Sequence, residues 1–274
     1  MNLSSSLKLN NGVALPLLGL GTYLAKDGDE TYNAVRYAID AGYKHIDTAE
    51  GYRNEGSVGK AIKDSGIKRE DIFITTKLWN ENQRQGTQYQ AFEESLRQLG
   101  VDYIDLYLIH WPVKGKFVET WKVFERIYKE GKARAVGVSN FHVHHLEDVF
   151  AASDLVPAVN QVECHPWLTQ VELADYCMKK GILFEPYSPL GAGQLINNEK
   201  LVSIAKKYDK TAAQLVLKWV LQRGFATIPK SVHKDRIIEN SQIFDFTITD
   251  EDMAEIFKLN QNKRTCADPE NFNF

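Results

Sequence analysis

The chain of 274 residues contains little cysteine and no long apolar run. Its cysteines, Cys164, Cys177 and Cys266, share no CxxC spacing, so we expect reduced thiols rather than disulfides or a zinc cluster. The longest apolar runs, such as LVLKWVL, are far shorter than the ~18 residues of a membrane span, and the start MNLSSSLKLNNG lacks the apolar centre of a signal peptide. We therefore expect a cytoplasmic protein without a membrane partner.

The chain also lacks an excess of either charge. A formal net charge of -3 and a pI near 6.2 provide no basic field for nucleic acid, and no run of like charges marks a tail. The composition, 43% hydrophobic and 25% charged, is typical of a globular domain. We expect a monomer whose partner is a small molecule.

Short apolar segments alternate with segments of helical periodicity along the chain. Strands are predicted at 17–22, 45–49, 72–78, 104–110, 135–140, 158–163, 183–188 and 226–231. Helical segments between them include 29–42, 89–100, 118–131, 142–153, 169–181 and 211–224, each closed by glycine or serine. Such alternation indicates βαβ units and a parallel sheet.

Eight strand–helix units within ~250 residues predict an α/β fold, a single (β/α)₈ TIM barrel. We expect one domain over 1–274, with an N-terminal β-hairpin at 1–16 around the Asn11-Gly12 turn capping the barrel. The alternative is a doubly wound dinucleotide-binding sheet. Its fingerprint is incomplete, because GLGTYL and GAGQLI each lack the third glycine, and the latter lies near the seventh strand.

Polar residues stand at the carboxyl ends of the predicted strands, where a barrel carries its active site. They are Asp47, Lys77, His110, Ser139, Asn140, Gln161, Glu163, Ser188, Lys230 and Ser231. Any one of them could be a turn former or a helix cap. A full ring of them at the ends of apolar strands predicts a site instead.

Two of these residues, Lys77 and His110, indicate a chemical role for Asp47 and Tyr52. A phenol has a pKa near 10, so Tyr52 needs a neighbour such as Lys77 to exchange its proton near pH 7. Asp47 could hold Lys77 charged and oriented, and His110 could bond the oxygen that Tyr52 protonates. These four residues predict a site that protonates a carbonyl oxygen while the carbon is attacked.

Six ordered motifs then resemble the aldo-keto reductase family, over nearly the whole chain from about Gly19. They are GYKHIDTAEGYRNEGSVGKAI, IFITTKLWN, DYIDLYLIHWP, AVGVSNF, NQVECHP and IPKSVHKDRIIEN. The chain is most similar to short microbial members such as 2,5-diketogluconate, glyoxal and methylglyoxal reductases. The resemblance implies metal-free, NADPH-dependent reduction of aldehydes and ketones, including dicarbonyls and diketo sugar acids, with Asp47, Tyr52, Lys77 and His110 catalytic and Tyr52 as the general acid.

The resemblance also implies where the cofactor and the substrate bind. Ser139, Asn140 and Gln161 would hold the nicotinamide carboxamide, and Tyr187 would stack on the ring. The pyrophosphate and adenosine 2′-phosphate ends would take Ser188, Leu190, Lys230, Ser231, Val232, Arg236, Glu239 and Asn240. Tyr23, Trp79, His110 and Trp111 would form the substrate wall. A Lys and an Arg six apart at the start of a short helix fit a dianion site.

Three other interpretations are weighed against this one. The cluster His142, His144 and His145 could bind a metal, but no carboxylate or cysteine completes a ligand spacing, so surface histidines are expected. Cys164 next to His165 could be a nucleophilic pair, but adjacent strand residues point oppositely. A cofactor-bound regulatory protein on the same scaffold is the alternative to an enzyme, and the presence of all four catalytic residues favours the enzyme.

Overall fold

The computed structural model describes residues 1–274 and contains a curled parallel sheet of seven strands. Each strand pairs with the next one along the chain, in the order β3-β4-β5-β6-β7-β8-β9. The strands are β3 (Leu20–Gly21), β4 (His45–Asp47), β5 (Phe73–Leu78), β6 (Ile104–Ile109), β7 (Ala133–Ser139), β8 (Val159–Glu163) and β9 (Leu183–Tyr187). Every predicted strand from 17–22 to 183–188 therefore overlaps an observed one, and β7 begins two residues earlier than predicted.

The eighth predicted strand, 226–231, differs from the prediction. It has no continuous ladder and forms two isolated bridges to the first part of the sheet, Leu18 with Thr227 and Gly21 with Lys230. Pro229 explains part of this difference, because proline has no N–H to give to a ladder, although its carbonyl still accepts from the Gly21 amide at 3.1 Å. The Thr227 hydroxyl donates to the Pro186 carbonyl of β9 at 2.9 Å, so the segment contacts both end strands of the curled sheet.

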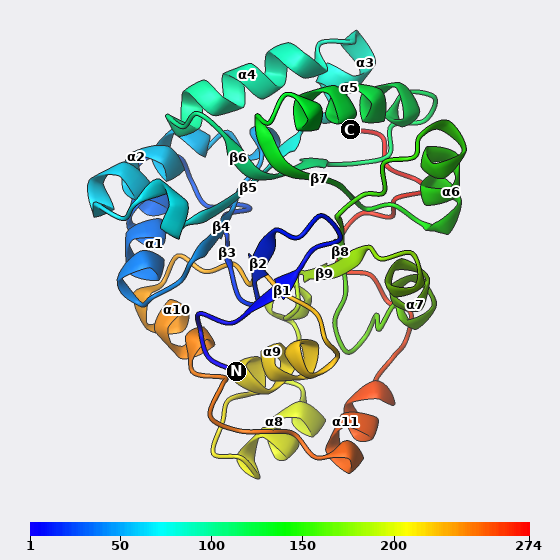
Figure 1. The fold of residues 1–274 in the computed structure, drawn as a ribbon. Helices are drawn as coiled ribbons and strands as arrows, with labels where there is room; N and C mark the ends of the chain where they lie inside the picture. The colour runs from blue at the N-terminus through cyan, green and yellow to red at the C-terminus, as the bar shows by residue number, and fades with distance from the viewer.

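Two short antiparallel strands, β1 (Ser6–Lys8) and β2 (Ala14–Pro16), form the expected N-terminal hairpin. Gly12 makes the turn with a φ of 90°, in the left-handed region that favours glycine. Leu9 and Leu15 belong to a buried cluster with Phe73, Leu106, Leu108, Ala135, Ala158, Val159 and Ala226. The hairpin thus packs against inward-facing side chains of the sheet, and Figure 1 shows it in front of the ring of strands.

Helices surround the sheet on its outer side (Figure 1). Six match the predicted segments: α1 (Asp29–Asp40), α4 (Gln88–Leu99), α5 (Phe117–Lys129), α6 (Val143–Ala152), α7 (Val171–Lys179) and α9 (Ala212–Gln222). Five more are α2 (Glu55–Ser65), α3 (Asn80–Gln85), α8 (Glu199–Lys206), α10 (Lys234–Ser241) and α11 (Asp250–Phe257), besides short 3₁₀ turns η1 (Glu50–Tyr52), η2 (Arg69–Asp71) and η3 (Gly191–Gly193). None of the helices has the length and apolar character to span a membrane.

The main core lies between the sheet and these helices. Helix α5 shows how the sequence directs this packing, because Phe117, Trp121, Phe124 and Ile127 recur at helical spacing and all are buried. The polar strand-end residues lie on the inner side of the sheet, away from this layer. The fold thereby separates an apolar outer core from a polar inner mouth, where the candidate site is found.

Candidate active site

The four predicted catalytic residues meet at one place, although they come from four different segments. Asp47 ends β4, Tyr52 ends η1, Lys77 lies near the end of β5, and His110 directly follows β6. Lys77 Nζ lies 2.5 Å from Asp47 Oδ1 and 3.4 Å from the Tyr52 hydroxyl. The rings of Tyr52 and His110 are 5.5 Å apart between centroids. The parallel register explains the convergence, because it carries all the carboxyl strand ends to one edge.

Lys77 is held as a buried cation. Its side chain has no exposed surface, and it donates hydrogen bonds to Asp47 Oδ1 and, at 2.9 Å, to the Thr48 carbonyl. A buried ammonium requires both a counter-charge and hydrogen-bond acceptors, and this site supplies them. The third direction of the ammonium is left for the phenol oxygen of Tyr52.

Tyr52 is positioned by residues that the sequence analysis did not assign. Glu50 accepts hydrogen bonds from the Trp79 backbone N–H, at 2.7 Å, and from the Asn82 side chain, which ties η1 to the start of α3. Asn54 is fully buried and donates to the carbonyls of Thr22 and Ala25, each at 3.0 Å. The chain after β4 is therefore clamped on both sides of Tyr52. The sequence carries no local signal for this role, because the burial of Asn54 is a property of the fold.

The titration behaviour of Tyr52 differs from the sequence-based expectation. Burial, followed by the charge of Asp47, raises the pKa of Tyr52 well above 10, although Lys77 Nζ lies 3.4 Å from its hydroxyl. Tyr52 therefore carries its proton throughout the physiological pH range. A protonated phenol beside an ammonium is the correct state for donating a proton to a carbonyl oxygen.

His110 is a neutral imidazole in this environment. Burial and then the charge of Lys77 lower its pKa well below 6.5. Its Nδ1 atom has no protein partner, and the Asn140 amide donates to its backbone carbonyl at 3.0 Å. His110 can therefore orient an oxygen by hydrogen bonding but does not add a second positive charge next to Lys77.

A cleft of about 1000 Å³ opens above these residues. It is lined by Asp47, Tyr52 and His110, by all four predicted substrate residues (Tyr23, Trp79, His110, Trp111), and by all twelve predicted cofactor residues: Ser139, Asn140, Gln161, Tyr187, Ser188, Leu190, Lys230, Ser231, Val232, Arg236, Glu239 and Asn240. Lys77 lies beneath its floor. The structure thus brings together every predicted site residue around one cavity.

The residues of the cleft fit a dinucleotide with an extra phosphate. Lys230 and Arg236 are exposed cations that form no ion pair with the protein, near the start of α10. Unpaired cations near a helix N-terminus favour a dianion. Toward the catalytic residues the cleft carries the Lys77–Asp47 ion pair and neutral polar groups, and the Tyr187 hydroxyl donates to Asn140 Oδ1 at 2.8 Å, which fixes both groups. The donor set matches the expected ends of NADPH.

The C-terminal segment contributes a part of the site that the sequence analysis missed. Cys266, Ala267 and Phe274 line the cleft, and the Phe274 ring stacks on Trp79 with centroids 5.8 Å apart and planes at 6°. Glu163, at the end of β8, anchors this segment by accepting from the Thr265 N–H at 2.5 Å and the Cys266 N–H at 3.1 Å. The buried Glu163 was noted in the sequence, but its partners lie about a hundred residues away.

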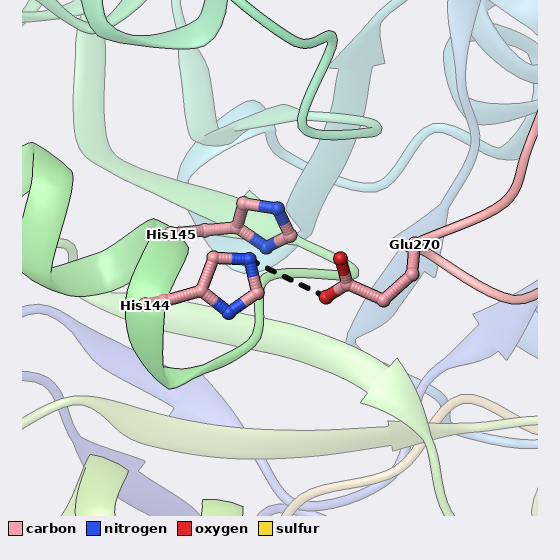
Figure 2. Close-up of side chains that lie close together, drawn as sticks. All are labelled: His144, His145 and Glu270. Carbon is pink, nitrogen blue, oxygen red and sulfur yellow. Dashed lines mark ion pairs between the residues drawn. The ribbon is translucent and has the colours of Figure 1, made fainter.

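The histidine cluster also differs from the expectation, because a carboxylate does join it. Figure 2 shows Glu270 from the C-terminal segment pointing toward His144 and His145 at the start of α6, with His144 Nε2 3.4 Å from Glu270 Oε1. However, His145 Nδ1 accepts the His142 backbone N–H at 3.1 Å, which places the His145 proton on Nε2 and leaves no lone pair there for a metal. The cluster caps a helix and attaches the C-terminal segment.

Cys164 is not an activated nucleophile. It is fully buried, and burial raises its pKa to about 11 despite the Arg223 guanidinium 3.3 Å away. A thiol in that state remains protonated near neutral pH, whereas nucleophilic cysteines have a lowered pKa. The alternative of a Cys164–His165 pair is therefore excluded on chemical grounds.

Comparison with known proteins places this site in a family. The family model "Aldo/keto reductase family" matches residues 17–261. The chain is 51% identical to the glyoxal reductase of Bacillus subtilis (strain 168) over 273 residues, which is 100% of this chain and 99% of that protein. A crystal structure of MGS-M4, an aldo-keto reductase from a Medee basin deep-sea metagenome library, superimposes with a TM-score of 0.95 at 47% identity, over 98% of this chain and 100% of the other.

A further solved structure, of an aldo-keto reductase complexed with NADPH, has a TM-score of 0.90 at 37% identity, over 96% of this chain and 89% of that one. The chain belongs to the aldo/keto reductase family. It is an NADPH-dependent oxidoreductase that acts on carbonyl and alcohol groups. The prediction of an enzyme rather than a regulatory protein is thereby confirmed.

Proposed function

We propose that this protein reduces small uncharged aldehydes and ketones, dicarbonyls such as methylglyoxal and glyoxal among them, with Tyr52 as the general acid. The observation that carries this proposal is the contact of Lys77 with both Asp47 and Tyr52 at the floor of a cleft whose far end holds unpaired cations. Proton donation and dinucleotide binding are thus combined in one cavity.

The proton side of the reaction belongs to the chain's own residues. Tyr52 holds a proton at its hydroxyl, and Lys77, 3.4 Å away, stabilises the phenolate that forms as this proton leaves. Asp47 keeps Lys77 in place through the 2.5 Å contact. His110 is neutral and can donate to the same carbonyl oxygen, which selects the orientation in which Tyr52 reaches it.

The cofactor side uses the remaining lining residues. NADPH supplies the hydride when it is bound. Asn140 and Ser139 would hold the carboxamide, Tyr187 would contact the ring, and Lys230 with Arg236 would hold the 2′-phosphate. The Asn140 side chain is already oriented, since its nitrogen donates to the His110 carbonyl and its oxygen accepts from Tyr187. Such pre-orientation lowers the entropy lost on binding.

The substrate end of the cleft favours uncharged carbonyls over the diketo sugar acids of the sequence-based expectation. Tyr23, Trp79, Trp111 and Phe274 make this end aromatic, while the lysine and arginine of the lining, Lys230 and Arg236, are assigned to the phosphate end. A carboxylate would lose its hydration there without gaining a free counter-charge, because Lys77 is already paired with Asp47. The name of the Bacillus relative, glyoxal reductase, supports the same substrate class.

The test is the fall in NADPH absorbance when purified protein meets methylglyoxal, glyoxal and a 2-keto acid of similar size. We expect reduction of the two dicarbonyls, with a higher KM for the acid. Tyr52→Phe should lower kcat ~10²–10⁴-fold while NADPH still quenches tryptophan fluorescence. Absence of NADPH oxidation with any uncharged carbonyl would refute the proposal, and a preference for the acid would refute its substrate class.

We further infer a single-domain (β/α)₈ barrel closed by the N-terminal hairpin, acting as a cytoplasmic monomer. The bridges of Leu18 and Gly21 to the segment 226–231 support closure of the ring, and three free cysteines suit a reducing compartment. Light scattering coupled to size exclusion tests the oligomeric state, because a monomer has a mass of 31.2 kDa.

A further inference from the structure

A second buried carboxylate lies beneath the catalytic residues, and the proposed function does not use it. Glu185 stands in the middle of β9, in register with Gln161 on β8, and it has no exposed surface. The Gln161 amide nitrogen donates to Glu185 Oε2 and to Asp47 Oδ2, each at 2.8 Å. The other Glu185 oxygen, Oε1, has no hydrogen-bond partner.

The chemistry of an amide makes this arrangement directional. An NH₂ group has two hydrogens, and here both are taken by carboxylate oxygens. The reverse orientation would turn the Gln161 carbonyl toward two carboxylates, so the network determines which way Gln161 points. Only the carbonyl oxygen of Gln161 then remains for a nicotinamide amide. Asp47 in turn has one oxygen held by Gln161 and the other by Lys77.

The charges around Glu185 do not balance. Asp47 from β4 and Lys77 from β5 are the charged groups that act on it, and Gln161 from β8 is neutral. Two carboxylates thus share one ammonium in a buried space. Burial, followed by the charge of Asp47, raises the pKa of Glu185 to about 7. A neutral side chain of the same size would fill this position without that cost, which argues against a role in packing alone.

We propose that Glu185 is a positioning residue for the reduction: through Gln161 it holds Asp47 against Lys77, and its own change of charge sets how readily Tyr52 releases its proton. This inference rests on the proposed function. Ionised Glu185 adds a negative charge near the site. This charge disfavours the Tyr52 phenolate, so the Tyr52 phenol becomes a weaker acid. Neutral Glu185 keeps the hydrogen bond from Gln161 without that penalty.

The test compares wild type with Glu185→Gln, an isosteric variant that cannot ionise but can still accept from Gln161. We measure kcat against pH at saturating NADPH and methylglyoxal, with deuterated NADPH used to verify that hydride transfer limits the rate. As pH rises, wild-type kcat should fall roughly 3- to 10-fold, with an inflection near pH 7. The variant should lack this inflection and keep its KM for NADPH within about twofold.

A matched control comes from a second buried glutamate, Glu55 on α2. Its pKa is also raised to about 7 by burial, but it bonds Thr76 and does not contact the catalytic residues. Glu55→Gln should keep the wild-type inflection. If Glu55→Gln removes the inflection, or if Glu185→Gln retains it, the inference is overturned.

A second readout needs no cofactor. The Glu185 carboxyl of wild type ionises near pH 4.5 in the unfolded state but only near pH 7 in the folded state, so wild-type stability falls between these pH values relative to Glu185→Gln. The melting temperature of the variant minus that of wild type should therefore increase from pH 5 to pH 8, and a constant difference would contradict the inference. If wild type oxidises no NADPH but this melting-temperature difference still increases with pH, the proposed function is refuted. The assignment of Glu185 as a buried ionisable group then still stands.

Discussion

Removing Lys77 alone, or Lys77 together with Asp47, should affect stability and activity differently. Lys77→Met replaces the ammonium by an apolar chain of similar length. Asp47 then keeps the Gln161 amide but loses its counter-charge in a fully buried place. Breaking a buried pair on one side costs ~3–5 kcal/mol, so the melting temperature should fall by roughly 6–20 °C.

The loss should depend on pH in a defined direction. Burial raises the pKa of Asp47 while Lys77 lowers it, so removing Lys77 raises that pKa further. At low pH the carboxyl is protonated in both states and the penalty is absent, and the penalty grows as pH rises toward neutrality. Unfolding by urea, followed by tryptophan fluorescence at a series of pH values, measures this dependence.

The double variant Asp47→Asn/Lys77→Met separates charge from chemistry. Both buried charges are gone, so most of the lost stability should return. Activity should not return, because Tyr52 still lacks the ammonium 3.4 Å from its oxygen, and kcat should stay at least roughly 100-fold below wild type. A double variant as unstable as Lys77→Met would show that the unpaired carboxylate is not the cause. Recovery of kcat would show that Lys77 is not needed for proton transfer.

Four further predictions concern single sites. Tyr52→Phe should lower kcat ~10²–10⁴-fold with NADPH affinity within about twofold, measured by turnover and fluorescence quenching; half of wild-type turnover would exclude Tyr52 as the acid. Arg236→Ala should weaken NADPH roughly 10- to 150-fold but hardly change NADH at one salt concentration, and equal weakening of both would move the phosphate site. Gly59→Ala should cost ~1–3 kcal/mol without changing kcat, because a Cβ there would lie 2.3 Å from the Leu99 carbonyl oxygen; unchanged urea unfolding would contradict this clash. Since burial raises the pKa of Glu55 to about 7, wild type should lose up to about 3 kcal/mol relative to Glu55→Gln as pH rises from about 4.5 to 7, and a difference constant with pH would count against it.

Seven of the eight strands and six of the helices could be predicted from the sequence, because their signals are local. Buried strands read as continuous apolar runs, and α5 carries apolar residues at every third or fourth place. The position of catalytic residues at strand ends follows from the same pattern, since a parallel sheet carries all its carboxyl ends to one edge. Asp47, Lys77 and His110 could therefore be named without any coordinates.

The segment 226–231, predicted as a strand, shows what local sequence patterns cannot predict. Its apolar residues satisfy a strand pattern, but a ladder needs donors from one chain opposite acceptors of another, and Pro229 lacks a donor. Whether such a segment forms a ladder or isolated bridges depends on its neighbours β3 and β9, which lie far from it in sequence. That outcome depends on contacts between segments distant in sequence, which no local pattern specifies.

The sequence by itself determined which residues we propose to carry the chemistry, since residue type and strand-end position are properties of the chain. Tertiary structure decided their charge states and their supports. Tyr52 keeps its proton because burial raises its pKa, and burial exists only in the folded molecule. Glu270 reaches His144 across more than a hundred residues, and Gln161 joins Glu185 to Asp47 from three different strands. Contacts at such separations have no local pattern, because the folding of intervening elements brings them together.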